Sequence, residues 1–135
     1  MIVLSNSNAQ VLAAGQSATF NFVILHTGCG ECYRPNSGAV NLIQNNAIYE
    51  VGYNCNIGGT AEGDAQIAIS LDGTPLSETT QKVVTAAAGD LEGVSASTYV
   101  KTCCHGFAGI ITLTNTGTTE INLDANPKLS VKRVA

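Results

Sequence analysis

One stretch of sequence, Ala65-Gln66-Ile67-Ala68-Ile69-Ser70-Leu71-Asp72-Gly73, indicates most clearly how the chain folds. Apolar residues recur in it at every second position, which is the period of a strand with one buried face. The residues on that face are Ala65, Ile67, Ile69 and Leu71. Asp72-Gly73 then offers two positions that tolerate positive φ, as a tight hairpin turn requires. The stretch therefore predicts a half-buried strand that ends in a hairpin.

The same period of two recurs along the chain, whereas helical periodicity is weak everywhere. The only helical candidate, Thr85-Ala86-Ala87-Ala88, meets Gly89 before two turns are complete. Strands separated by short turn signals are typical of a closed barrel or a two-sheet sandwich. The sequence thus predicts an all-β fold, with further strands within 19–26, 47–57, 83–85, 94–102, 109–114, 120–123 and 128–134.

Length and composition bound the remaining possibilities. A chain of 135 residues is sized for one core, so we expect a single domain over residues 1–135, without linker or internal repeat. Hydrophobic residues at 44% exclude a disordered chain. Charged residues are only 12%, the net charge is −4 and no basic run occurs, which disfavours nucleic-acid partners and anionic membranes. Aromatic residues at 5%, without tryptophan, argue against stacking platforms for nucleic-acid bases and for many carbohydrates.

Targeting signals are absent from the sequence as read. The N-terminal residues Met1-Ile2-Val3-Leu4 carry no basic region and only a short apolar run, so we expect no signal peptide within this chain. No segment approaches the roughly 18 consecutive apolar residues of a membrane span, and no membrane insertion is expected.

Four of the five cysteines occur in two clusters. Cys29 and Cys32 form a C-x₂-C pair, and Cys103-Cys104 is an adjacent pair. Three interpretations stay open: disulfides between the clusters, free thiols, or a zinc site. Adjacent residues on a strand point to opposite faces, which counts against zinc. The disulfide candidates are Cys29, Cys32, Cys103 and Cys104, and the candidate metal ligands add His26 and His105.

No catalytic motif emerges from the sequence. It contains no G-x-S-x-G elbow, no phosphate-binding glycine loop and no H-E-x-x-H helix. No helix is expected after Cys32, so a thioredoxin-like role is disfavoured. Cys55 lies on the apolar side of the strand within 47–57 and is expected to be a small buried hydrophobe. We therefore predict a protein that is not an enzyme and needs no cofactor.

Three segments resemble one known family, the C1q/TNF-like jelly-roll head domain found in bacterial collagen-like surface proteins and phage fibre proteins. Tyr49–Asn54 resembles its central strand, and Ile67–Leu76 resembles its strand followed by an N-G-x-P-L turn. Ile111–Asn115 together with Leu129–Arg133 resembles its two closing strands. Ala47 departs from the pattern, since the family usually has glycine there.

The resemblance implies a two-sheet antiparallel jelly-roll sandwich of about ten strands that trimerises through one face of one sheet. Tyr49, Val51 and Tyr53 are then candidates for the trimer interface, unless these side chains fill the core of the single subunit. The same resemblance places the strands before Cys29 and Cys103 at opposite edges of one sheet. On that basis the cysteines would staple the trimer rather than one subunit.

The function implied by the resemblance is that of a structural or adhesion head on a bacterial surface or a virion. The expected partners are further copies of the chain, as a homotrimer, and a cell-surface receptor or glycan. The alternatives are a module that binds a small ligand or carbohydrate, and a zinc-stabilised β-sandwich. No G-x-y repeat occurs here, so no collagen stalk lies within this chain.

Overall fold

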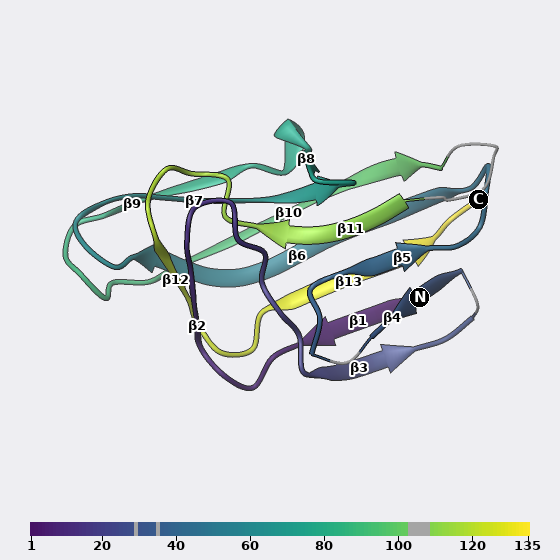
Figure 1. Cartoon of the computed structure of the whole chain (residues 1–135), viewed down its shortest axis with the longest axis horizontal. Helices are drawn as coiled ribbons and strands as arrows, with labels where there is room; N and C mark the ends of the chain where they lie inside the picture. The colour runs from purple at the N-terminus through teal and green to yellow at the C-terminus, as the bar shows by residue number, and fades with distance from the viewer. Residues whose placement is uncertain (29, 35, 103–108) are drawn as a thin grey trace.

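Two antiparallel β-sheets lie face to face and run along the long axis of the molecule (Figure 1). This computed structural model describes residues 1–28, 30–34, 36–102 and 109–135. Within these residues the elements are 13 strands and one short 3₁₀ helix, η1, at Ser77–Thr79. The fold is therefore all-β, as the two-residue periodicity predicts.

The first sheet has seven strands, built around the long strand β6. One side of β6 pairs with β10, and the other side pairs with β13 and β12. From β13 the sheet continues through β1 to β3, which is its last strand. The bounds are β1 Ile2–Ser5, β2 Gln10–Leu12, β3 Phe22–His26, β6 Ile48–Gly59, β10 Glu92–Lys101, β12 Ile121–Leu123 and β13 Lys128–Arg133.

The second sheet has six strands, built around β7. β7 pairs with β11 along one side, and with β8 and β9 along the other. β11 also pairs with β5, which pairs with the edge strand β4. The bounds are β4 Glu31–Tyr33, β5 Val40–Leu42, β7 Gly63–Leu71, β8 Thr74–Pro75, β9 Gln81–Thr85 and β11 Gly109–Thr114.

The hairpin at Asp72-Gly73 is confirmed. β7 turns back into β8 with Leu71 opposite Thr74, and the two turn residues have φ of 52° and 82°. Both angles are positive, as a two-residue turn matching the twist of the strands requires. The carboxylate of Asp72 also accepts a hydrogen bond from the backbone N–H of Ile110 at 2.9 Å, which ties the turn to β11.

The structure has more strands than the approximately ten that the resemblance implies. The additional ones are short, for example β8 at two residues and β2, β4 and β5 at three residues each. Such segments are too short to show a period of two, and only their neighbours in the sheet define them. The run at 85–88 is not helical; β9 ends there at Thr85.

The core lies between the inner faces of the two sheets. Tyr49, Val51, Tyr53, Cys55 and Ile57 of β6 are all buried in it, facing Ile67 and Ile69 of β7 among other apolar side chains. The Tyr49 hydroxyl donates to the Gly30 carbonyl at 2.5 Å, and that of Tyr53 donates to the Thr79 carbonyl at 2.6 Å. Both polar tips are thus satisfied inside the sandwich.

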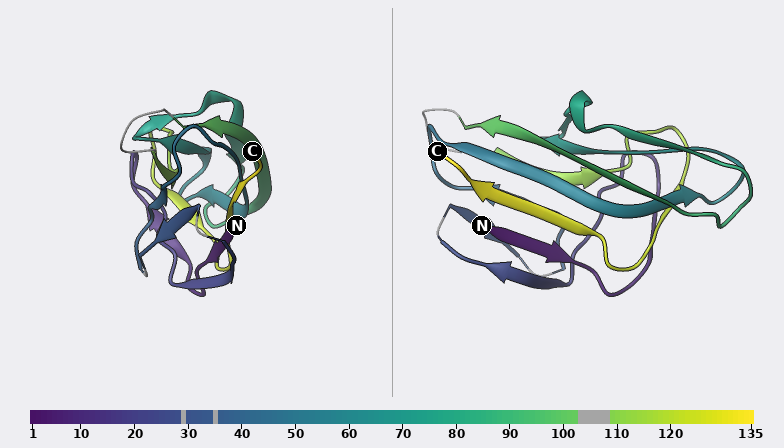
Figure 2. Two further views of the ribbon diagram at one scale, coloured as in Figure 1. Left: turned by 90° about the vertical axis from the view of Figure 1, so that its right-hand side faces the viewer. Right: turned by 180° about the vertical axis from the view of Figure 1, so that it is seen from behind.

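Both ends of the described chain lie at the same end of the sandwich (Figure 2). There the ammonium group of Met1 donates to the Thr27 carbonyl at 2.5 Å and forms an ion pair with Glu31. Glu31 is almost fully buried, and its charge has this ammonium as partner. A buried carboxylate is costly without a partner, so the ion pair fixes β1 against the start of β4.

Candidate functional site

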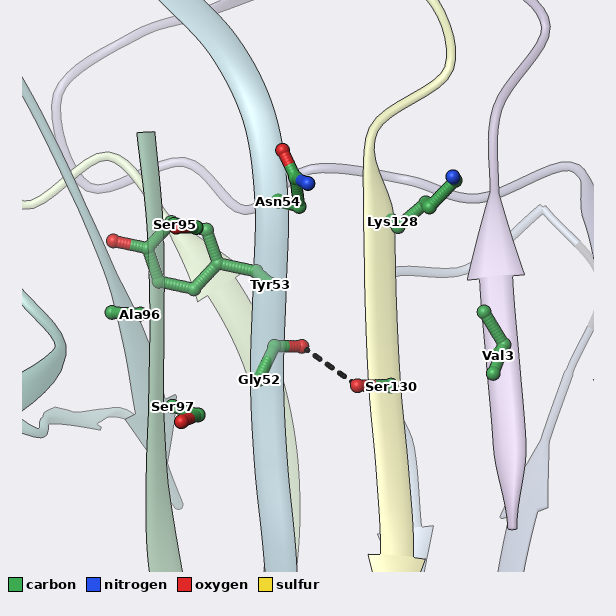
Figure 3. A pocket seen from close by; sticks show the side chains of 9 residues that line it. All are labelled: Val3, Gly52, Tyr53, Asn54, Ser95, Ala96, Ser97, Lys128 and Ser130. Atoms are coloured by element: carbon green, nitrogen blue, oxygen red, sulfur yellow. Dashed lines mark hydrogen bonds between the residues drawn. The ribbon is translucent and has the colours of Figure 1, made fainter. Parts of the chain in front are cut away.

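The outer face of the first sheet, directed away from the second sheet, carries a shallow groove. It is about 360 Å³ in volume and crosses the strands β10, β6, β13 and β1 (Figure 3). Across its floor runs one row of directly paired residues, in which Ser97 pairs with Gly52, Gly52 with Ser130, and Ser130 with Val3. Beyond the groove, Val3 pairs in turn with Leu25 of β3. Four small or medium side chains and a glycine therefore lie side by side across five strands.

Gly52 keeps the floor of this groove low. A Cβ atom there would lie 3.2 Å from the Cβ of Ser97 and 3.3 Å from the carbonyl oxygen of Ala96, tighter than ordinary contacts. The Ser130 hydroxyl donates to the Gly52 carbonyl at 3.4 Å (Figure 3). A side chain at this position would therefore require the neighbouring strands to shift by a few tenths of an ångström.

Polar residues border the groove on both sides. On one side Tyr99 pairs with Glu50, which pairs with Lys132. On the other side the border consists of Ser95, Asn54 and Lys128, again paired in register. Tyr99 is 67% exposed, although its ring is apolar. A floor of small residues between polar borders offers an approachable surface with polar contacts at its rim, as in protein interfaces.

At one end the groove meets an apolar strand edge. β3 contributes four consecutive exposed apolar residues, each between 41% and 50% exposed, and we call them the β3 lip: Phe22, Val23, Ile24 and Leu25. The register between β1 and β3 shifts between Val3 and Leu4, so β3 contains a bulge. Single exposed apolar residues are ordinary, but a continuous strand of them marks a contact surface.

The trimer-interface candidates Tyr49, Val51 and Tyr53 do not lie on the surface of the subunit. All three side chains are buried within the subunit, at 4% exposure or less. They point into the sandwich because β6 alternates, and the odd-numbered residues in this part of it face the second sheet. These residues fill the core and have no exposed surface for a neighbouring chain. Their location agrees with the other interpretation of the sequence, in which the three side chains fill the core of the single subunit.

The metal and disulfide candidates lie only partly within the described residues. His26 is exposed at the end of β3, and Cys32 is exposed in β4, with no disulfide to another described cysteine. Cys29, Cys103, Cys104 and His105 lie outside the described residues. In the part of the chain that the structure describes, no three His, Cys, Asp or Glu side chains gather as a metal site would require.

The strands next to the two cysteine clusters are far apart in the first sheet but close together in the second. β3 and β10 do lie at opposite edges of the first sheet, as the resemblance implies. In the second sheet, however, only β5 separates β4 from β11, because Leu42 pairs with both Glu31 and Gly109. Two strand spacings amount to about 10 Å. Glu31 and Gly109, which lie near the two clusters in the sequence, are therefore closer within one subunit than the positions of β3 and β10 suggest.

Burial shifts the ionisation of groups on the inner side of β6. Desolvation raises the pKa of the Cys55 thiol to about 12, and it also raises the pKa of the Tyr53 hydroxyl. The pKa of Tyr49 is raised as well, first by burial. Cys55 is thus a protonated, inert thiol at neutral pH, as expected of a small buried hydrophobe.

Sequence reasoning missed the groove residues Gly52, Ser97 and Ser130. Each is a small residue at an outward position of a predicted strand, and nothing in the local pattern distinguishes it from other outward positions. The available signal was Gly52, since a glycine in the middle of a strand marks a close approach of backbone or ligand.

Residues 1–28, 30–34, 36–102 and 109–135 contain no helix of the length and hydrophobicity needed to cross a membrane.

The chain matches no protein-family model and no curated protein sequence. Solved structures resemble it closely in shape. The globular domain of zebrafish complement 1qA protein has a TM-score of 0.60 at 8% identity, covering 96% of this chain and 94% of that one. Murine APRIL at pH 5.0 has a TM-score of 0.61 at 12% identity, covering 97% and 96%. Neither name describes an enzyme. At these identities the likeness concerns the fold alone, and it shows that the chain has the C1q/TNF-like jelly-roll fold.

Proposed function

We propose that this protein is a non-enzymatic structural head that assembles as a homotrimer through the outer face of its first sheet. The observation that carries the proposal is the paired row Ser97, Gly52, Ser130, Val3 and Leu25. The small residues Ser97, Gly52 and Ser130 would let the backbone of a neighbouring copy approach closely, and dispersion contacts grow with close packing.

The surroundings of the row support the same face. Three-fold assembly is head to tail, so this face must meet a different surface of the next copy. The β3 lip and the exposed ring of Tyr99 supply apolar surface that leaves water on contact, while Glu50 and Lys132 supply polar contacts between them. Apolar area removed from water contributes about 25 cal/mol per Å².

A surface location fits this proposal, on a bacterial cell or a virion, with a cell-surface receptor or a glycan as partner. The proposal is supported by the composition of the chain. Charged residues make up only 12% of it, and small neutral polar residues are abundant, which suits a robust exposed shell. The C1q/TNF-like fold adds a resemblance to head domains of surface and fibre proteins.

Light scattering coupled to size-exclusion chromatography tests the trimer. The wild-type protein is expected to elute at three times the chain mass of 13.9 kDa. Ser97→Arg places a large charge on the groove floor and should yield monomers, with the circular dichroism spectrum unchanged. Thr112→Arg is the matched control, because Thr112 lies on the outer side of β11 in the second sheet, and it should remain trimeric. A wild-type monomer at micromolar concentration would remove the proposal.

We further propose that Cys29, Cys32, Cys103 and Cys104 staple the trimer covalently. Non-reducing electrophoresis of freshly prepared protein tests this, with and without a zinc chelator. Bands at two or three chain masses that collapse on reduction are expected. Monomer alone under both conditions contradicts the staple and leaves the non-covalent trimer to be judged by light scattering.

A further inference from the structure

A second hollow lies on the outer side of the second sheet, away from the groove. It is about 370 Å³ in volume, within the range of small-molecule sites. The loop between β11 and β12 lies beside β7 and β9 (Figure 1). The hollow is lined by residues of this loop and of these two strands. Except for one glycine, its lining is polar: Asp64, Gln66, Lys82, Thr116, Gly117, Thr118 and Thr119.

The loop wall is held in place from below by Asn115, which is fully buried. Its side-chain amide donates to the carbonyls of Leu12 at 3.0 Å and Thr119 at 2.8 Å. Its side-chain carbonyl accepts from the N–H of Gly117 at 3.0 Å. These bonds fix the loop without any ligand, so a ligand would meet a preorganised wall and lose less free energy on binding.

Two further bonds join the loop to β7. The Thr119 hydroxyl donates to the Asp64 carbonyl at 2.9 Å, and the Gln66 amide donates to the Thr116 hydroxyl at 3.1 Å. The side-chain oxygen of Gln66 and the hydroxyl of Thr118 form no hydrogen bond with any described residue. Both line the hollow and are available to a ligand.

The charges in the hollow cancel. The Lys82 ammonium forms an ion pair with the Asp64 carboxylate at 2.9 Å, and both side chains are about half exposed, at 54% and 55%. The pair presents strong donors beside a strong acceptor, with no net charge to attract an ion. Neighbouring hydroxyl groups of a polyol fit it, because one can donate to the carboxylate while the other accepts from the ammonium.

We propose that this hollow binds a neutral saccharide, with Asp64, Lys82, Gln66 and Thr118 as its hydrogen-bonding groups. A saccharide is the biological ligand that is uncharged, of this size and rich in paired hydroxyls. No aromatic side chain lines the hollow, so a single sugar binds weakly and gains avidity only from several copies on one particle. The hollow lies within one subunit and does not depend on trimer formation.

Titration of ¹⁵N-labelled full-length protein with methyl glycosides of glucose, galactose, mannose and N-acetylglucosamine tests the proposal by NMR. At least one glycoside should cause saturable shifts of the Gly117 and Thr118 amides and of the Gln66 side-chain amide. Lys82→Met and Thr118→Val each remove hydrogen-bonding groups with little change of size, and together they should weaken binding about tenfold or more. Lys128→Met and Thr112→Val, which lie outside the hollow, are the matched controls and should bind as the wild type does.

Three outcomes overturn the proposal. The first is no saturable shift with any of the four glycosides up to 50 mM. The second is saturable shifts that map elsewhere, and the third is equal binding by the hollow variants and the controls. The same spectra report whether each variant is folded, so a lost response is not confused with a lost structure.

Discussion

The two faces of β6 carry very different side chains. Its inner face carries Tyr49, Val51, Tyr53, Cys55 and Ile57, all buried, whereas its outer face carries polar residues around Gly52. Both faces occupy the same twelve residues. The large side chains that suggest an interface in the sequence build the core of the subunit, and the outer face of the same strand is centred on a glycine.

The proposed trimer assigns stability and assembly to opposite sides of one strand. Substitutions on the inner face should change the free energy of unfolding, while those on the outer face should change the oligomeric state. The predictions below test that separation, and all measurements compare variants at equal protein concentration because assembly stabilises the folded state.

The largest effect is expected from Tyr49→Ala on the inner face. Removal of this fully buried ring leaves a cavity and loses the hydrogen bond to Gly30, so the free energy of unfolding should fall by about 3–5 kcal/mol. Urea denaturation followed by circular dichroism measures the change. Tyr99 is the matched control, because it is also a tyrosine but is 67% exposed. Tyr99→Ala should change the free energy of unfolding of the monomer by less than about 0.5 kcal/mol. Similar losses in both variants would abolish the distinction between the faces.

A smaller effect is expected from Gly52→Ala at the floor of the groove. The added Cβ meets Ser97 and the Ala96 carbonyl at 3.2–3.3 Å, and moving these strands apart should cost about 1–3 kcal/mol. Gly93→Ala in β10 is the control, since its Cβ would meet only the movable side-chain oxygen of Asn56 at 3.2 Å. An unchanged urea midpoint for Gly52→Ala would show that the groove floor is not tightly packed.

The most gradual effect is expected from pH. Burial raises the folded-state pKa of Cys55 from 9.0 to about 12, and it raises that of Tyr53 above 10.0. The unfolded chain releases these protons first, so the stability is fully present below about pH 9 and falls as the pH rises toward 12. Each such group should lower the free energy of unfolding by about 1.4 kcal/mol per pH unit within its window.

Urea midpoints at pH 8, 9, 10 and 11 measure this decline. Cys55→Ala removes one of the titrating groups and should flatten the slope just above pH 9, before the tyrosines contribute. Midpoints that stay constant up to pH 11 would contradict the burial of these groups, and with it the assignment of the inner face to the core.

Much of the fold could be predicted because its signals are local. The alternation in Ala65–Leu71 and the Asp72-Gly73 turn are confirmed as a strand and a hairpin, since pleat and turn geometry depend on adjacent residues. The burial of Cys55 follows from the same alternation. The short strands β4 and β5 could not be predicted, because their pairing with β11 defines them.

The candidate sites depended on register rather than on pattern. The groove requires three strand pairings that bring Ser97, Gly52, Ser130 and Val3 into one row, although these residues span most of the chain. The saccharide hollow likewise joins a loop held by Asn115 to residues of β7 and β9.

The sequence by itself determined that this chain is all-β, that its cysteines divide into a buried Cys55 and two clusters, and that its tyrosines lie on a half-buried strand. Only the tertiary structure decided which face of that strand is buried within the subunit and which residues meet across the sheet. The physical reason is that side-chain alternation is set by two neighbouring residues, whereas burial and pairing are set by partners far away in the chain.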